Sequence, residues 1–292
     1  MKLGAVEAGG TKFVVAIGNE LGEIIERESF STRTPKETVA DIISFFDGKD
    51  IEALGVGSFG PIDLDVNSPT YGYITTTPKP NWGNIDLIGM LKKQFSIPIG
   101  FDTDVNVAAL GEITFGSAKG LDSCLYLTVG TGIGGGAIVE GKLLHGLLHP
   151  EMGHIRLVRR KDDPYHGKCP YHDDCFEGLA SGPAIEERWG RKAIEIEEAH
   201  PAWDLEAYYI GQALANYILI LSPKKIILGG GVMKQSQLFP MIHQYVKQFL
   251  DGYIQKKEIL ESIEEYIVYP KLDDNAAICG GLSLAINALN EK

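Results

Sequence analysis

Two glycine-rich turns in this chain carry the residue types that bind phosphate. One spans residues 7–12 (EAGGTK) and the other residues 130–136 (GTGIGGG), and each joins two apolar, strand-like runs. Glycine lets the backbone approach an anion closely and adopt positive φ, so successive N–H groups can converge on phosphate oxygens. Tight hairpins that need glycine for geometry alone are the alternative, but two such turns in one chain favour nucleotide binding. The predicted phosphate contacts are Gly9, Gly10, Thr11, Lys12, Gly130, Thr131 and Gly132.

A cysteine- and histidine-rich segment, residues 169–175 (CPYHDDC), has the ligand types of a zinc site. Cys169, His172 and Cys175 follow one another at spacings of three, and one histidine upstream, either His154 or His166, would complete a tetrahedral Cys2His2 site. A closed site of this kind is structural, and at about 10 kcal/mol of apparent binding free energy it would order a long polar loop. The alternative is a flexible loop in which these residue types coincide by chance.

Asp104 is the candidate general base for phosphoryl transfer, a reaction that needs a base near the acceptor hydroxyl, donors around the phosphates, and magnesium. It follows a predicted strand and begins a predicted helix, so its carboxylate could face a cleft. Its alternative role is a helix cap that accepts backbone N–H bonds. A further glycine cluster, Gly229, Gly230 and Gly231, also lies between a strand and a helix. It would let adenosine lie against the backbone, or serve as a plain connector.

The apolar pattern places these groups on an α/β chain. Strands are predicted over residues 3–6, 13–17, 24–30, 53–58, 98–101, 125–129, 137–139, 225–228 and 266–269. Helices are predicted over 35–46, 86–95, 104–115, 205–221, 238–250 and 275–289, with a loop-rich stretch over 144–177. Strand, glycine turn, strand occurs in both halves, and a chain of 292 residues exceeds what one core usually organises. We therefore expect two domains, residues 1–116 plus 275–292 and residues 117–274.

The net charge of −12 argues against a nucleic-acid backbone or an anionic membrane as the main partner. No window approaches the roughly 18 apolar residues of a membrane span, and no secretory signal pattern precedes the first strand. We therefore expect a cytoplasmic protein. Cys124 and Cys279 lie in apolar segments and are expected to be buried thiols rather than part of a disulfide framework.

Three motifs in order, residues 7–12, 103–112 (TDVNVAALGE) and 128–136 (TVGTGIGGG), resemble the ROK family of sugar kinases and repressors. The resemblance covers nearly the whole chain, because residues 151–154 (EMGH), the Cys/His segment and residues 226–231 (IILGGG) fall where that family carries sugar, metal and adenosine motifs. It implies the two-domain actin-like and hexokinase-like (ribonuclease H-like) ATPase fold, with an interdomain cleft. The opening motif and the CPYH segment are most similar to those of bacterial zinc-containing fructokinases.

The resemblance also implies an activity and its residues. It implies ATP-dependent phosphorylation of a hexose 6-hydroxyl, most readily that of fructose, with Asp104 as base and with ATP, Mg²⁺ and Zn²⁺ as cofactors. It favours His154 over His166 as the fourth zinc ligand and implies a homodimer. Isolated glutamates are usually just solvated, and Gly-Pro and Pro-Asn pairs are also common plain turns. The implied sugar contacts are Gly60, Pro61, Asn81, Thr103, Glu151, His154 and Glu177.

Two positions depart from the family pattern. Thr103 replaces the usual Asn before the catalytic Asp, which weakens one sugar contact but not the base. Glu7 replaces the commoner Asp, so it either holds magnesium through water or is a solvent-facing strand end. Lys12 is likewise either a β-phosphate contact or an ordinary strand lysine.

Three other functions are alternatives to a fructose kinase. A kinase for glucose, mannose or an N-acetylated hexosamine differs from a fructose kinase only in substrate preference. A sugar-responsive repressor needs a helix-turn-helix, for which a first strand at Leu3 leaves no room. A catalytically inactive sugar- or metal-binding protein is the third alternative.

Overall fold

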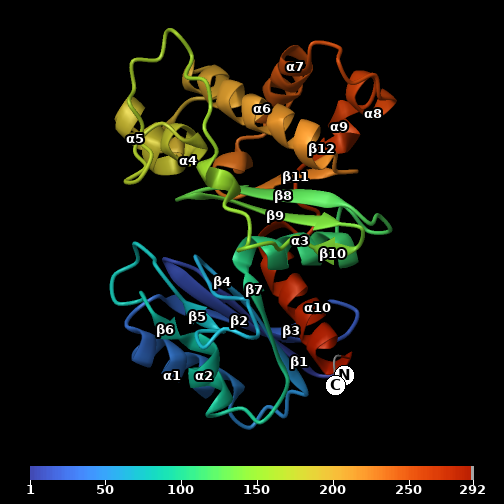
Figure 1. Ribbon diagram of the computed structural model, residues 1–292. Coiled ribbons are helices and arrows are strands. Elements are labelled where there is room, and N and C mark those ends of the chain that lie inside the picture. The colour runs from blue at the N-terminus through green and yellow to red at the C-terminus, as the bar shows by residue number, and fades with distance from the viewer. Residues whose placement is uncertain (291–292) are drawn as a thin grey trace. The chain divides into compact units, whose positions relative to one another are not determined.

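The computed structural model describes residues 1–290 and divides into two compact units (Figure 1). The first unit contains Met1–Gly120, Lys142–Pro150 and the described residues from Lys271 onward, and the second contains Leu121–Gly141 and Glu151–Pro270. The predicted division, 1–116 plus 275–292 and 117–274, differs from these units by a few residues at each boundary. It also did not anticipate that Lys142–Pro150 packs with the first unit. Glu291 and Lys292, which that prediction included, lie outside the described residues.

The first unit is built on a five-stranded sheet of order β3-β2-β1-β4-β7. Its strands are β1 (Leu3–Ala8), β2 (Lys12–Gly18), β3 (Ile24–Ser31), β4 (Ala53–Ser58) and β7 (Ile99–Thr103). The first three form an antiparallel meander, and β4 and β7 follow on the side of β1 and run parallel to it. The register pairs Ala8 with Ser58 and Ser58 with Thr103, so three carboxyl ends lie side by side. Such an edge is where α/β folds commonly bind ligands.

Helices and two short strands complete the first unit. They are α1 (Pro35–Phe46), β5 (Tyr73–Ile74), β6 (Ile85–Asp86), α2 (Leu87–Lys92), α3 (Asp104–Thr114), the 3-10 turn η4 (Asp273–Asn275) and α10 (Ala276–Asn290). Asp86 caps α2 by accepting a hydrogen bond from the backbone N–H of Gly89. Helix α10 packs against β1, β4 and α3. A Cβ at Gly280 would lie 1.7 Å from the carbonyl oxygen of Val107, so α10 and α3 touch backbone to backbone.

The second unit is built on four strands in the order β9-β8-β11-β12. They are β8 (Cys124–Val129), β9 (Ile133–Val139), β11 (Ile226–Gly229) and β12 (Ile267–Val268), whereas the two-residue strand β10 (Lys142–Leu143) belongs to the segment Lys142–Pro150 of the first unit. Strands β8 and β9 form an antiparallel hairpin, and β11 runs parallel to β8 with Gly229 opposite Thr128. The strand, glycine turn, strand repeat is therefore present in both units.

The second unit contains one long, mostly buried helix and several shorter ones. They are α4 (Phe176–Ala180), α5 (Gly182–Trp189), α6 (Ala202–Leu221), α7 (Leu238–Leu250), α8 (Lys257–Leu260) and α9 (Ile263–Tyr266), with 3-10 turns η1 (Met152–His154), η2 (Ala193–Glu195) and η3 (Val232–Lys234). Helix α6 is buried along most of its length and packs against α7 and α4. Among the described residues, no helix combines the length and the apolar character that crossing a membrane requires.

Candidate functional site

The first predicted glycine turn connects β1 to β2, and close approach explains its glycine. The backbone N–H of Gly9 donates to the carbonyl of Lys12 at 3.1 Å. A Cβ at Gly9 would lie 2.5 Å from that carbonyl oxygen, whereas a Cβ at Gly10 would meet open space. Neither glycine has positive φ, so close approach rather than left-handed backbone accounts for the glycine here. Thr11 and Lys12 are exposed at its tip.

The second glycine turn connects β8 to β9 and adjoins the glycine cluster that follows β11. A Cβ placed on Gly130 would lie 3.7 Å from the backbone nitrogen of Gly231, and one placed on Gly231 would meet open space. Positive φ occurs here only at Gly230, where it is 92° and where a Cβ would lie 2.4 Å from the carbonyl of Val129. The ends of two parallel strands therefore present a side-chain-poor backbone surface.

Glu177 is bound to this second glycine turn. Its Oε2 accepts a hydrogen bond from the backbone N–H of Ile133 at 2.9 Å. A Cβ at Gly132 would lie 2.7 Å from the same oxygen, so glycine is needed there to admit the carboxylate. The turn is further held by the N–H of Gly182, which donates to the carbonyl of Gly130 at 2.7 Å.

Asp104 lies at the first position of α3, directly after the carboxyl end of β7. The capping role belongs to its neighbour, because the hydroxyl of Thr103 accepts the backbone N–H of Asn106 at 3.2 Å. One oxygen of Asp104 accepts the N–H of Val105 at 2.9 Å. The side chain of Asp104 is thus positioned at the helix start without being the cap.

Two carboxyl groups of the first unit have raised pKa values. Burial raises the pKa of Asp104 to about 6, against hydrogen bonds from backbone N–H groups that favour its ionised form. Burial, and next to it the negative charge of Asp104, raises the pKa of Glu7 to about 7. Glu7 is therefore not a freely solvated strand end, which was one of its two predicted readings. Raised carboxyl pKa values near neutrality are typical of catalytic and ligand-binding positions.

A second acidic group on the same strand was not singled out from the sequence. Asp102 is buried in β7 and accepts the side-chain amide of Asn106 at 2.7 Å. Its other oxygen lies 2.9 Å from Nε2 of His145. That hydrogen bond raises the pKa of the imidazole above its usual value. The Asp-Thr-Asp run at a strand end was the available signal for Asp102, but His145 comes from a segment that the sequence pattern left as loop.

The turn after β4 is also tied to this segment. The buried ring of His149 accepts the backbone N–H of Ile62 at 3.1 Å, one residue after the predicted sugar contacts Gly60 and Pro61. Asn81 is exposed with φ of 68°, next to Trp82, which is fully buried and donates from its indole N–H to the carbonyl of Arg33 at 2.9 Å. The buried indole fixes the turn that presents the Asn81 amide.

The structure brings together the four predicted metal ligands of the second unit. His154, Cys169, His172 and Cys175 each offer one ligand atom, and these atoms all lie within 4.8 Å of one another. Nδ1 of His154 is 3.7 Å from Sγ of Cys169 and 3.5 Å from Sγ of Cys175. A tetrahedral zinc with ordinary bond lengths separates sulfur and nitrogen ligands by about 3.6 Å. The cluster therefore has the ligand types and spacing of such a site, and exposed His166 lies outside it.

Backbone hydrogen bonds hold the ligand-bearing turns of this metal cluster. The N–H of Cys169 donates to the carbonyl of Asp173 at 3.2 Å, and the N–H of Asp173 donates back at 3.0 Å. The N–H of Phe176 donates to the carbonyl of Ile155 at 2.9 Å. These bonds fix the turn that carries Cys169 and tie the residue after Cys175 to the residue after His154.

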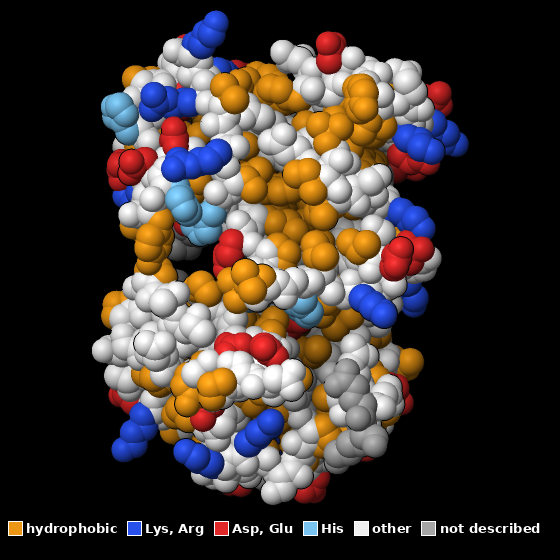
Figure 2. All heavy atoms as spheres, in the orientation of Figure 1, with side chains coloured by type: hydrophobic (Ala, Val, Ile, Leu, Met, Phe, Trp, Pro, Cys, Tyr) orange, Lys and Arg blue, Asp and Glu red, His pale blue; other side chains and the backbone are white. Residues whose placement is uncertain are grey.

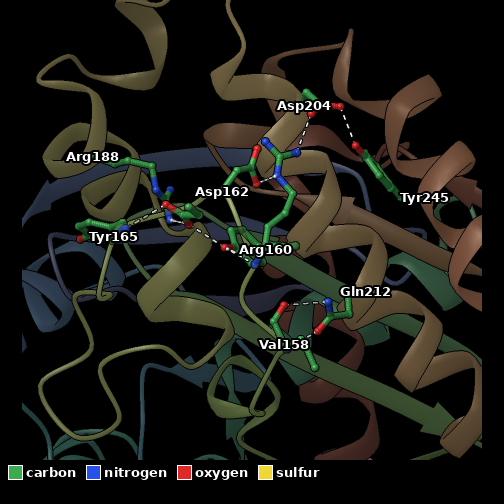
Figure 3. A network of polar contacts seen from close by, with 10 residues as sticks. Val158, Arg160, Asp162, Tyr165, Arg188, Asp204, Gln212 and Tyr245 are labelled. Atoms are coloured by element: carbon green, nitrogen blue, oxygen red, sulfur yellow. Dashed lines mark hydrogen bonds and ion pairs between the residues drawn. The ribbon is translucent and has the colours of Figure 1, made fainter.

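The loop between His154 and Cys169 is fastened along α6. The amide of Gln212 exchanges two hydrogen bonds with the backbone of Val158, at 2.5 Å and 3.1 Å. Figure 3 shows the guanidinium of Arg160 between Asp162 and Asp204, with contacts of 2.7 Å and 2.6 Å. Polar side chains of a mostly buried helix thus order a loop that the sequence predicted as irregular.

A buried ion pair fastens the same loop to α5. Nη2 of Arg188 lies 3.2 Å from Asp163 and donates to the carbonyl of Leu179 at 2.8 Å. The hydroxyl of Tyr209 donates to the same oxygen of Asp163 at 2.6 Å. Because both charged groups are buried, breaking this pair would leave an uncompensated charge.

Glu151 is the last of the predicted sugar contacts. Glu151 is exposed and immediately precedes η1 (Met152–His154), whose end carries His154.

On the face drawn in Figure 2, basic side chains are scattered among acidic ones. That face therefore shows no gathered patch of positive charge.

The chain matches the model of the ROK family over residues 3–288. It is 59% identical over 287 residues to a Bacillus subtilis (strain 168) protein named "Putative fructokinase", covering 98% of this chain and 96% of that protein. It is 47% identical over 289 residues to a fructokinase of Pediococcus pentosaceus, covering 99% of each. A solved ROK hexokinase of Thermus thermophilus has a TM-score of 0.82 at 24% identity, covering 100% of both chains, and so shares the fold.

Proposed function

Since this chain belongs to the ROK family, we propose that it is an ATP-dependent hexose kinase that phosphorylates the sugar 6-hydroxyl, with fructose as its preferred substrate. The relatives that are 59% and 47% identical over nearly their whole length carry fructokinase names, which supports fructose over glucose or mannose. The alternative substrates are glucose, mannose and N-acetylated hexosamines. A homodimer and a cytoplasmic location stay predictions of the sequence.

Asp104 carries the proposal. Its carboxylate stands at the start of α3 without serving as the cap, and its pKa of about 6 lets it be ionised at neutral pH while remaining basic enough to accept a proton. In the proposed reaction Asp104 takes the proton from the acceptor hydroxyl as that oxygen attacks the γ-phosphorus of ATP. The adenosine diphosphate leaves with the electron pair of the broken P–O bond.

The glycine turns supply backbone donors for the nucleotide. The Gly130 turn and the Gly229–Gly231 cluster are the proposed contacts of the second unit, and the Gly9 turn with Thr11 and Lys12 is that of the first. Mg²⁺ accompanies ATP as its counter-ion and neutralises charge on the transferring group. Glu7 is proposed to hold that ion through water, since Mg²⁺ retains several water ligands.

Zinc is proposed at the cluster of His154, Cys169, His172 and Cys175, where it would be structural. Because His154 turns Nδ1 toward both thiols, its Nε2 is left for a hydroxyl of the sugar. Glu151, Glu177, Asn81, Thr103 and the Gly60-Pro61 turn are the other proposed sugar contacts. Glu177 already has a backbone partner in Ile133, so it would contact sugar with its remaining lone pairs.

The decisive experiment is a coupled assay over a panel of hexoses with Mg·ATP, run on the wild-type chain and on Asp104→Asn. We expect the highest kcat/KM with fructose and a loss of about 10²–10⁴-fold in kcat for the variant, the range for a general base. Binding of hexose should survive, because the amide keeps the shape of the carboxyl group. Near-wild-type turnover by Asp104→Asn would remove Asp104 from this role, and preference for another hexose would reassign the substrate.

A further inference from the structure

The segment Lys142–Pro150 packs with the first unit, yet none of its residues was predicted to contact a ligand. Two of its side chains reach the strand edge that carries Asp104. His149 is buried and accepts the backbone N–H of Ile62 through Nε2. The ring of His145 is held by Asp102, two residues before Asp104, but its side chain remains 40% exposed. His149 is thus an anchor, whereas His145 is fixed on one side and open on the other.

The contacts of His145 involve only one of its two ring nitrogens, Nε2. Nε2 lies 2.9 Å from the carboxylate of Asp102, a side chain only 3% exposed. The same nitrogen is 3.3 Å from the side-chain amide nitrogen of Asn106. Among the described residues, Nδ1 of His145 has no hydrogen-bond partner. A carboxylate that orients one imidazole nitrogen and leaves the other for a ligand is a recurring arrangement in binding sites.

A second polar atom in this cluster also lacks a partner. Oδ1 of Asn106 is buried and accepts no hydrogen bond from any described residue. The amide nitrogen of Asn106 donates to Oδ1 of Asp102. If the nitrogen and oxygen of this amide were exchanged, the amide oxygen would face the carboxylate oxygen and two acceptors would meet. A buried acceptor without a donor is costly unless a water or a ligand satisfies it. The cluster beside the candidate base therefore lacks hydrogen-bond donors.

We propose that His145 is a sugar-contacting residue, whose Nδ1 binds a hydroxyl group of the hexose substrate. This inference rests on the proposed hexose kinase function. A hydroxyl fits because it both donates and accepts, so it can pair with Nδ1 of the neutral ring or with Nδ1–H of the imidazolium. Asp102 is the positioning residue, since it fixes the ring through Nε2. The direction of the His145 pKa shift agrees with this tether.

A simpler role for His145 is to hold the segment Lys142–Pro150 on the first unit. His145→Gln separates the two roles. The amide nitrogen of Gln reaches as far as Nε2 and can still donate to Asp102, but Gln has no polar atom at the position of Nδ1. His145→Ala removes both contacts. His166→Gln, at an exposed histidine outside the metal cluster, is the matched control.

The test measures KM for fructose, KM for ATP, kcat and thermal stability for these variants. For His145→Gln we expect KM for fructose to rise about tenfold, the effect of losing one hydrogen bond to a ligand. KM for ATP and the melting temperature should stay near the wild-type values. His145→Ala should raise KM for fructose at least as much, and His166→Gln should change none of these quantities.

Two kinetic results would contradict the proposal. A wild-type KM for fructose in His145→Gln would overturn the proposal and leave His145 as an anchor only. A raised KM for ATP with unchanged KM for fructose would assign the ring to phosphate instead, and would also overturn it. Failure of the proposed function is a separate result, in which the wild-type chain phosphorylates no hexose. Calorimetric titration then measures the affinity of wild type and His145→Gln for fructose. Equal affinity of the two proteins overturns the proposal for His145, and so does the absence of binding by both.

Discussion

Burial raises the pKa values of Asp104 and Glu7 into the range that acid–base catalysis uses. Asp104 has its pKa raised to about 6 by burial, and Glu7 has its pKa raised to about 7 by burial and by the charge of Asp104. Two carboxyl groups that influence each other in this way do not ionise independently. A divalent cation near Glu7 would favour its ionised form, so saturating magnesium separates the two titrations.

The pH profile of the reaction tests the role of Asp104. As a base, Asp104 must be deprotonated, and its pKa is raised, so activity should fall as the pH drops through that pKa. At saturating magnesium we expect log(kcat/KM) for fructose to be flat above about pH 7 and to decline below about pH 6. The residual activity of Asp104→Asn should lack this limb. A decline only near pH 4 in the wild type would mean that the titrating group is not Asp104.

The candidate site contains residues that the sequence can predict and residues that it cannot. Asp104 could be proposed from the sequence because its position after a strand and before a helix is a local pattern. The four metal ligands were found because three of them are close in sequence, and the cluster in the structure has His154 rather than His166. His145 and Asp102 were missed because their contact joins segments about 40 residues apart, and no periodicity reports such a pair.

At the scale of elements, the crossing of α3 and α10 determines where Asp104 lies. Gly280 of α10 faces the backbone of Val107 in α3, and Gly111 of α3 faces the backbone of Ala276 in α10. Only residues without a side chain allow this approach. Since Asp104 is the first residue of α3, the position of its carboxylate depends on a helix at the other end of the chain.

Gly280→Ala tests this dependence. Its Cβ would lie 1.7 Å from the carbonyl oxygen of Val107, so α3 and α10 must separate. We expect a loss of about 1–3 kcal/mol in unfolding free energy, as for overpacked cores, despite the higher helix propensity of Ala. At temperatures where the variant is folded, kcat should also fall because Asp104 is displaced.

Asn287→Ala is the matched control, because Asn287 is exposed on the same helix. It should be neutral or slightly stabilising and should leave kcat unchanged. Wild-type stability and kcat in Gly280→Ala would show that the close crossing does not constrain the base.

The presence of helices and strands was easier to predict than the contacts between them. The long helices α6, α7 and α10 and the strands around both glycine turns lie where the apolar pattern placed them. Helix α5 was missed because it is short and mixed in polarity, although Ser181 before it and Pro183 in its first turn are start signals. The fastening of the loop by Gln212 and Arg188 was not predictable, because it depends on polar side chains whose partners are backbone atoms and a buried carboxylate from distant segments.

At the scale of the whole molecule, stability is expected to depend on a metal in one of its two units. The second unit contains a loop of irregular backbone between His154 and Cys175, and the candidate zinc ligands stand at both of its ends. The polar contacts to α5 and α6 order the middle of this loop. Cross-linking the two ends through one ion would restrict the unfolded chain and supply binding free energy that only the folded unit can use.

Removal of the metal therefore has a definite expected outcome. Gently purified protein should contain about one zinc per chain, and a chelator should lower the melting temperature by about 10 °C or more, since structural zinc contributes about 10 kcal/mol in small zinc peptides. Zinc should restore the lost stability where magnesium does not. Cys175→Ser should reproduce the chelated state, whereas His166→Ala should retain both zinc and stability because His166 lies outside the cluster. Metal analysis that finds no zinc, or a melting temperature indifferent to chelation, would leave the four ligands as a hydrogen-bonded cluster. The ordering of the loop would then rest on the buried Asp163–Arg188 pair and the contacts to α6 alone.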